Sequence, residues 1–209
     1  MSAPRGRGRA VSIAFDAAAR KVGMAKAKLR HMGSPYVMGD GDSFPVFYPK
    51  YIGRWGGTQI VGGIGLYVRP FESWWADLVD MFNKTTRDQG PVIGIYILNF
   101  RSMMGAPALL ASETAEIEEW AAKIASLARQ IFPPERDIFD IICSEDLAGL
   151  GLREYIWPSV KTYAFNIWLH LQRPDIKVPI DLKLLDELDI SRREPEYEFL
   201  NANYGDIDP

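Results

Sequence analysis

The chain has 209 residues, of which 47% are hydrophobic and 12% aromatic, and its formal net charge is −3. This composition is typical of a globular domain with a well-stocked core. No apolar run approaches the roughly 20 residues that a membrane-spanning helix needs, and the single cysteine, Cys143, excludes an intramolecular disulfide. We therefore expect an intracellular protein in a reducing compartment, with a viral particle or an organelle as alternative locations.

The charge is divided unevenly along the chain. Residues 1–30 contain eight basic residues and one acidic residue, whereas residues 105–209 contain ten basic and twenty acidic residues. The first segment therefore carries +7 and the last carries −10. Such an asymmetry concerns partners and self-association rather than the fold. The cations of the first segment are Arg5, Arg7, Arg9, Arg20, Lys21, Lys26, Lys28 and Arg30.

The first 54 residues divide into three predicted parts. Residues 1–9 alternate Arg with Gly near their end and are predicted to form a flexible basic arm. From Val11 to Leu29, apolar residues recur at three- and four-residue steps, which predicts an amphipathic helix that ends before Gly33. Residues 36–54 contain too many Gly and Pro residues for a helix, so loops and short extended pieces are predicted there.

Two strands and an intervening helix are predicted next. Residues 58–68 alternate apolar side chains with glycines, and residues 92–100 are almost continuously apolar, as strands often are. Residues 71–88 carry large apolar side chains at helical spacing. This order fits a right-handed parallel crossover, and an antiparallel pairing of the two strands is the alternative.

The second half is predicted to be mainly helical. Apolar stripes indicate helices over residues 112–131 and 158–172, and residues 194–209 are predicted to form an extended acidic tail. The predicted fold class is α+β, with a small, glycine-punctuated sheet packed by several amphipathic helices. A single domain over residues 10–193 would lie between the extended N- and C-terminal arms.

No motif in the chain specifies a reaction. The glycines of residues 53–65 lack a following Lys-Ser/Thr pair and helix, so they are expected to permit bends and close packing rather than to bind phosphate. His31, Cys143 and His170 lie far apart in the sequence and lack the local spacing of a zinc site. We expect neither a cofactor nor a metal, and an enzyme is the less favoured class.

A ligand pocket near the glycine-rich strand is one alternative. Trp55 follows Arg54 in a predicted loop, and the carboxylates Asp40 and Asp42 lie between nearby turn residues. A pocket that gathered these four side chains would suit an enzyme or a small-ligand-binding domain.

The basic N-terminal segment favours nucleic acid as the partner. Cations that neutralise phosphates release counterions, which drives binding with little sequence preference. The arm lacks aromatic rings for base stacking, so contact with the phosphate backbone is expected. The leading hypothesis is a non-enzymatic, self-associating structural protein, of a packaging or coat type, that binds nucleic acid, with single-stranded RNA as the first candidate. The alternative is a protein–protein interaction module whose oppositely charged ends meet head to tail.

Overall fold

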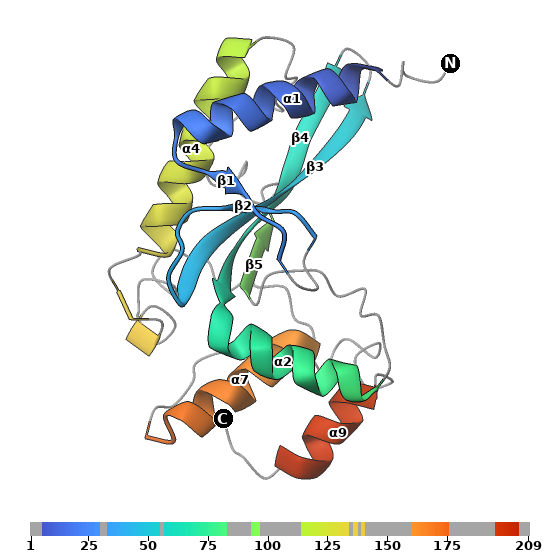
Figure 1. Cartoon of the computed structure of the whole chain (residues 1–209), viewed down its shortest axis with the longest axis vertical. Helices are drawn as coiled ribbons and strands as arrows, with labels where there is room; N and C mark the ends of the chain where they lie inside the picture. Colours follow the sequence, from blue (N-terminus) through green and yellow to red (C-terminus); the bar gives the residue numbers. More distant parts are fainter. Residues whose placement is uncertain are drawn as a thin grey trace.

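The computed structural model describes residues 6–29, 33–54, 57–82, 93–96, 114–133, 136–137, 139–140, 160–175 and 195–204. Its elements form an α+β fold, which confirms the predicted class (Figure 1). The helices are α1 (Gly6–Lys21), α2 (Arg69–Met81), α4 (Thr114–Ile131), α7 (Val160–Gln172) and α9 (Pro195–Tyr204). The strands are β1 (Ala25–Lys26), β2 (Tyr36–Val37), β3 (Ser43–Arg54), β4 (Gly57–Val68) and β5 (Ile93–Tyr96).

The strands form one antiparallel sheet in the order β1-β2-β3-β4-β5. β3 and β4 make up most of the sheet, because they pair without interruption from Ser43 opposite Val68 to Arg54 opposite Gly57. β5 lies antiparallel to β4, with Ile93 opposite Leu66. The two predicted strands are therefore confirmed in the antiparallel arrangement, and the parallel crossover is not formed.

β3 corrects the prediction of loops over residues 36–54. The carbonyl oxygen of Pro45 accepts a hydrogen bond of 3.0 Å from the N–H group of Met38, so this position of β3 faces the β2 side. Pro49 lies four residues further on and therefore faces the same side. The N–H groups that both prolines lack would point away from β4, so the long β3–β4 ladder tolerates them.

Gly62 in β4 allows β3 to approach closely. A Cβ atom at Gly62 would lie 1.7 Å from the carbonyl oxygen of Tyr48. No side chain fits in that space, so close packing is the role of this glycine, as the sequence predicts for the glycine-rich strand.

Helix α1 ends earlier than predicted. Gly23 adopts a φ of 79°, the N–H group of Met24 donates to the carbonyl oxygen of Ala19 (2.9 Å), and that of Gly23 donates to Arg20 (3.2 Å). These two bonds form a Schellman motif, which closes a helix at a left-handed residue. The helix predicted to reach Leu29 therefore stops at Lys21, and the chain continues into β1.

The N-terminal arm is also shorter than predicted. Helix α1 begins at Gly6, so the second half of the predicted arm, residues 6–9, is helical rather than extended. The helix therefore begins more than one turn before Val11, the first buried residue among those whose side chains are described. Residues 1–5 lie outside the described residues.

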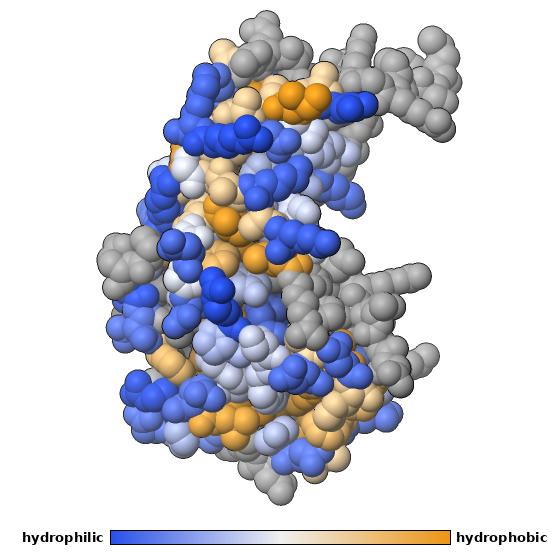
Figure 2. Space-filling model, viewed as in Figure 1, coloured by the Kyte–Doolittle hydropathy of each residue, from blue (hydrophilic) through white to orange (hydrophobic). Residues whose placement is uncertain are grey.

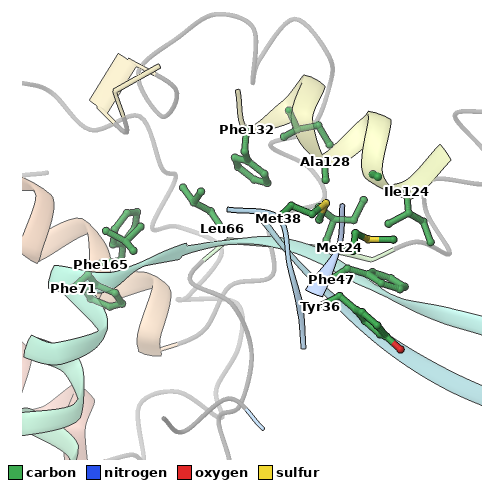
Figure 3. Close-up of a cluster of buried hydrophobic side chains, with 14 of the residues drawn as sticks. Met24, Tyr36, Met38, Phe47, Leu66, Phe71, Ile124, Ala128, Phe132 and Phe165 are labelled. Carbon is green, nitrogen blue, oxygen red and sulfur yellow. The ribbon is translucent and has the colours of Figure 1, made fainter. Parts of the chain in front are cut away.

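One face of the sheet is covered by α1 and α4 (Figure 1). The rings of Phe15 and Tyr36 lie 5.2 Å apart, and Phe47 lies 5.6 Å from Phe15. From α4, Ile124 and Ala128 point toward the sheet, above Met24, Met38 and Phe47 (Figure 3). Burial of each large apolar side chain stabilises the fold by about 1.5–3 kcal/mol. We call the sheet with α1 and α4 the sheet region.

Helices α2, α7 and α9 form a second layer at the other end of the molecule (Figure 1), which we call the helical region. Phe71 of α2 packs edge-to-face against Phe165 (5.0 Å) and Trp168 (5.9 Å) of α7. These contacts confirm the cores of the helices predicted over residues 71–88 and 158–172, and α4 confirms the helix predicted over residues 112–131. Residues 83–88 lie outside the described residues.

Helix α9 corrects the prediction of an extended acidic tail. It begins at Pro195, a residue suited to a first helical turn, and it buries Leu200 completely. The rings of Tyr197 and Tyr163 of α7 lie 5.3 Å apart. An apolar contact face therefore holds this acidic segment against the domain.

Candidate functional site

The solvent-facing side of α1 carries two arginines and an exposed isoleucine. We call Arg9, Ile13, Ala17 and Arg20, all exposed, the α1 outer face; it lies opposite the buried Phe15. Arg9 and Arg20 are separated by about three helical turns, so they lie almost in line and roughly 16 Å apart along the axis. The Ile13 side chain between them is 60% exposed. Figure 2 shows apolar surface flanked by hydrophilic surface along this helix.

Two of the predicted nucleic-acid-binding cations are engaged by carboxylates. Lys21 Nζ lies 2.6 Å from Glu118 Oε1 of α4, and Lys26 Nζ lies 3.5 Å from Asp16 Oδ1. Asp16 also accepts a hydrogen bond from the Tyr36 hydroxyl. Exposed pairs of this kind stabilise little, but they reduce the local positive charge. Lys21 and Lys26 are therefore weaker candidates for phosphate contact than the sequence alone indicates.

Three further cations keep their charge exposed. Arg9, Arg20 and Lys28 are exposed, and none has an acidic partner within 4.0 Å in the described part of the chain. Arg129 of α4 adds a fourth beside the end of α1, because its Nη2 donates to the carbonyl oxygen of Val22 at 2.8 Å. A cation there complements the partial negative charge of the α1 C-terminus. Sequence reasoning missed Arg129 because a separation of 107 residues gives no local signal.

Several predicted site residues are described only in part. Arg5, Arg30 and Trp55 lie outside the described residues, as do His31 and Cys143. For Arg7 in α1 and Arg54 in β3 the structure describes the backbone alone. His170 is half-buried near the end of α7. Within the described ranges, no three His, Cys, Asp or Glu residues are gathered as a metal site requires.

The structure does not bring Asp40 and Asp42 together with Arg54, three of the four residues of the predicted ligand pocket. Asp40 and Asp42 precede β3, whereas Arg54 is its last residue, and an extended strand of that length separates its ends by roughly 35 Å. The Asp42 carbonyl oxygen instead accepts a hydrogen bond from the Arg69 N–H group (2.7 Å), and the Asp40 carbonyl oxygen accepts one from the Arg69 guanidinium (3.2 Å). This loop positions the start of α2.

A buried ion pair that sequence reasoning did not single out joins α2 to α7. Lys161 Nζ lies 2.7 Å from Glu72 Oε1 and 2.8 Å from Glu72 Oε2. The two residues are only 1% and 6% exposed. A signal was available in the sequence, because Lys161 precedes Phe165 and Trp168 by four and seven residues and thus occupies a position of their apolar stripe. Burying two charges is costly, so such a pair is weak evidence for stability, although the loss of one partner would be strongly destabilising.

Two tyrosines of the sheet lie near this pair. Burial raises the pKa of Tyr48 above its ordinary value, and the negative charge of Glu72 raises it further. The pKa of Tyr67 is raised by the same two causes in the same order. These shifts keep both phenols protonated and neutral beside the carboxylate.

The helical region contains further buried polar side chains. Asn166 is 0% exposed, and neither of its amide atoms has a hydrogen-bond partner among the described residues. Thr162 and Glu196 are also buried. With Lys161 at 1% exposure, a dissolved substrate does not reach its amine in this conformation. Among these buried polar side chains, the ion pair of Lys161 with Glu72 joins α2 to α7.

Comparison with protein-family models, with curated proteins and with solved structures finds no match to this chain. The function is therefore argued from the residues of the candidate sites. Of the described helices, none is long and apolar enough to cross a bilayer.

Proposed function

We propose that this protein binds nucleic acid through phosphate contacts made by α1 and the segment that follows it, and that it self-associates as a structural protein. The observation that carries the proposal is the pair Arg9 and Arg20, which lie in line on the solvent side of α1 without a carboxylate partner among the described residues. Exposed Lys28 and Arg129 extend this positive surface around the C-terminal end of α1.

Electrostatic attraction to the phosphate backbone is the expected mode of binding. The exposed cations are separated along a helix rather than gathered around a pocket, and such a surface contacts phosphates without distinguishing bases. Single-stranded RNA is the first ligand to test, with a duplex as the second.

The test uses point variants of the full chain. Deleting residues before Gly33 would also remove Phe15 and Met24, which are 0% and 1% exposed core residues, so a truncated chain would lose binding through unfolding. Arg20→Gln and Lys28→Gln each remove an exposed cation. Lys21→Gln is the matched control, because it removes a charge that Glu118 already engages.

The measurement is a titration of labelled single-stranded RNA and of a duplex at several salt concentrations. We expect binding by the unaltered chain to weaken steeply with salt. Each of Arg20→Gln and Lys28→Gln should reduce the slope of the logarithm of affinity against the logarithm of salt by about 0.7–0.9. Lys21→Gln should change it much less. Binding that is absent, or that is insensitive to salt, overturns the proposal.

A protein-interaction module is the second candidate, and Ile13 favours it. An apolar side chain that is 60% exposed between two arginines gains nothing from a phosphate backbone, whereas a protein partner would bury it. Retained self-association after nuclease treatment, together with no binding of RNA or duplex, would make this the better description.

A further inference from the structure

Helix α2 presents a solvent-facing side with the opposite charge to α1. Ser73, Asp77, Asp80 and Met81 are exposed on the side away from the buried Phe71 and Trp75, and we call these four residues the α2 outer face. The Met81 side chain is 59% exposed. Ile13, Met81 and Leu171 are the large hydrophobic residues exposed on the described surface, so each of the two outer faces holds one of them.

The two outer faces match in spacing as well as in charge. On α1 the cation Arg9 precedes Ile13 by four residues, and on α2 the carboxylate Asp77 precedes Met81 by four residues. Four residues span about 6 Å along a helix and return to nearly the same side. When the two helices pack side by side in the same direction, Arg9 therefore lies opposite Asp77 while Ile13 lies opposite Met81.

The two outer faces cannot contact each other within one chain. Helix α1 lies at one end of the long axis of the molecule and α2 lies toward the other (Figure 1). A contact between them therefore needs two copies. Because it joins different surfaces of the two copies, it is heterologous and leaves a free α1 outer face and a free α2 outer face at the ends of each assembly.

We propose that the α1 outer face of one copy docks against the α2 outer face of a second copy, so that the protein associates head to tail. The contact combines one opposite-charge pair with one apolar pair. A single contact between two helices buries little surface, so we expect a weak, transient interface. Raised salt weakens it, because its charges lie at the surface. This contact uses the same α1 outer face as the proposed nucleic-acid binding, whereas Asp77 and Met81 lie outside the basic surface, so changes on α2 test the docking alone.

The test uses one variant for each face. The α1 variant is Arg9→Glu with Ile13→Ser, and the α2 variant is Asp77→Lys with Met81→Ser. We expect the unaltered chain to increase in mass with concentration in analytical ultracentrifugation after nuclease treatment. Each variant alone should associate at least about tenfold more weakly, because like charges then face each other across the contact.

Mixing the two variants is the decisive step. The α1 variant keeps an intact α2 outer face and the α2 variant keeps an intact α1 outer face, so an equimolar mixture should recover an association that neither variant shows by itself. A mixture that stays monomeric while the unaltered chain associates overturns the proposal. An α2 variant that associates like the unaltered chain, or an unaltered chain that stays monomeric at high concentration, also overturns it.

Two controls separate loss of the docking contact from a general effect of charge changes and from an effect on RNA binding. Ala122→Glu and Asp42→Lys change charge at exposed positions of α4 and of the loop before β3, and they should leave the association unchanged. The α2 variant should retain the RNA binding of the unaltered chain. Loss of association with retained RNA binding in the α2 variant supports the docking surface by itself. A reduced salt slope of RNA binding in Arg20→Gln, with retained association, concerns the nucleic-acid proposal alone.

Discussion

The sheet region and the helical region bury different kinds of side chain. Among the described residues between the sheet, α1 and α4, the buried side chains are apolar or aromatic, and the ion pairs, such as Lys21 with Glu118, lie at the surface. The buried polar and charged residues that the structure describes all belong to α2, α7 and α9. They are Glu72, Lys161, Thr162, Asn166 and Glu196.

This difference shows how the position of a charge decides what it does. A surface ion pair exchanges hydration for a weak, screened attraction, so it contributes at most about 1 kcal/mol. A buried pair costs much more to desolvate, so its loss is expensive even where its net contribution to stability is small. We therefore expect the helical region to tolerate charge changes far less than the sheet region does.

The largest effect is expected from Lys161→Met. This change leaves the buried Glu72 without its ammonium partner and should lower the free energy of unfolding by about 3–5 kcal/mol. Urea denaturation followed by circular dichroism measures it. The double variant with Glu72→Met should recover most of the loss, and Lys123→Met, which breaks the exposed pair with Glu119, should cost less than about 1 kcal/mol. Equal effects of Lys161→Met and Lys123→Met would remove the contrast between buried and surface charge.

The next largest effect is expected in the hairpin of β3 and β4, after which the chain enters α2 of the helical region. Gly62→Ala would place a Cβ atom against the Tyr48 carbonyl oxygen and should cost at least about 2 kcal/mol in the same denaturation measurement. Gly41→Ala is the matched control, because a Cβ atom there meets its nearest neighbour, the Ser43 carbonyl oxygen, at 3.9 Å. If Gly62→Ala is as mild as Gly41→Ala, β3 and β4 are not in close contact at that position.

Alkaline pH should destabilise the fold through Tyr36 and Tyr48. Burial raises the pKa of Tyr48 and of Tyr36 above the ordinary value of 10.0. Above that pH the unfolded chain loses the phenolic proton while the folded chain keeps it, so the stability present below it is lost as the pH rises. One pH unit above this ordinary pKa, each of the two tyrosines should lower the free energy of unfolding by about 1.4 kcal/mol. The variant Tyr48→Phe should not show the part of this loss that is due to Tyr48.

The neutral-pH comparison of the same variants sharpens the result. The Tyr48 hydroxyl is buried without a hydrogen-bond partner in the described part of the chain, so Tyr48→Phe should leave the free energy of unfolding unchanged or slightly raised in urea denaturation. The Tyr36 hydroxyl donates to Asp16, so Tyr36→Phe should cost about 1.5–3 kcal/mol. A destabilising Tyr48→Phe at neutral pH would contradict this assignment.

The smallest effect is expected at the surface of the sheet region. Lys21→Met breaks an ion pair whose side chains are 66% and 43% exposed, and it should cost less than about 1 kcal/mol. A double-mutant cycle with Glu118→Gln at low and high salt measures the coupling, which should shrink with salt. A coupling that is large and insensitive to salt would show that Lys21 and Glu118 behave as a buried ion pair, like Lys161 and Glu72.

Sequence patterns predicted the elements whose identity depends on local periodicity. The apolar periodicity of α4 and α7 and the alternation of side chains along β4 depend on residues close together in the sequence. These elements were therefore predicted correctly. The end of α1 had a local signal in Gly23, but the apolar spacing that continues to Leu29 outweighed it. β3 was missed because the effect of Pro45 and Pro49 depends on which neighbouring strand their missing N–H groups would face.

The sequence by itself determined the α+β class, the apolar faces of its helices and the excess of basic residues near the N-terminus. The tertiary structure alone decided which charges meet. It brings Glu118 to Lys21, joins Lys161 to Glu72 across 89 residues, and separates Asp40 and Asp42 from Arg54 by the length of β3. The reason is physical: periodicity reports contacts within a few residues, whereas burial and pairing depend on segments that meet only after the chain has folded.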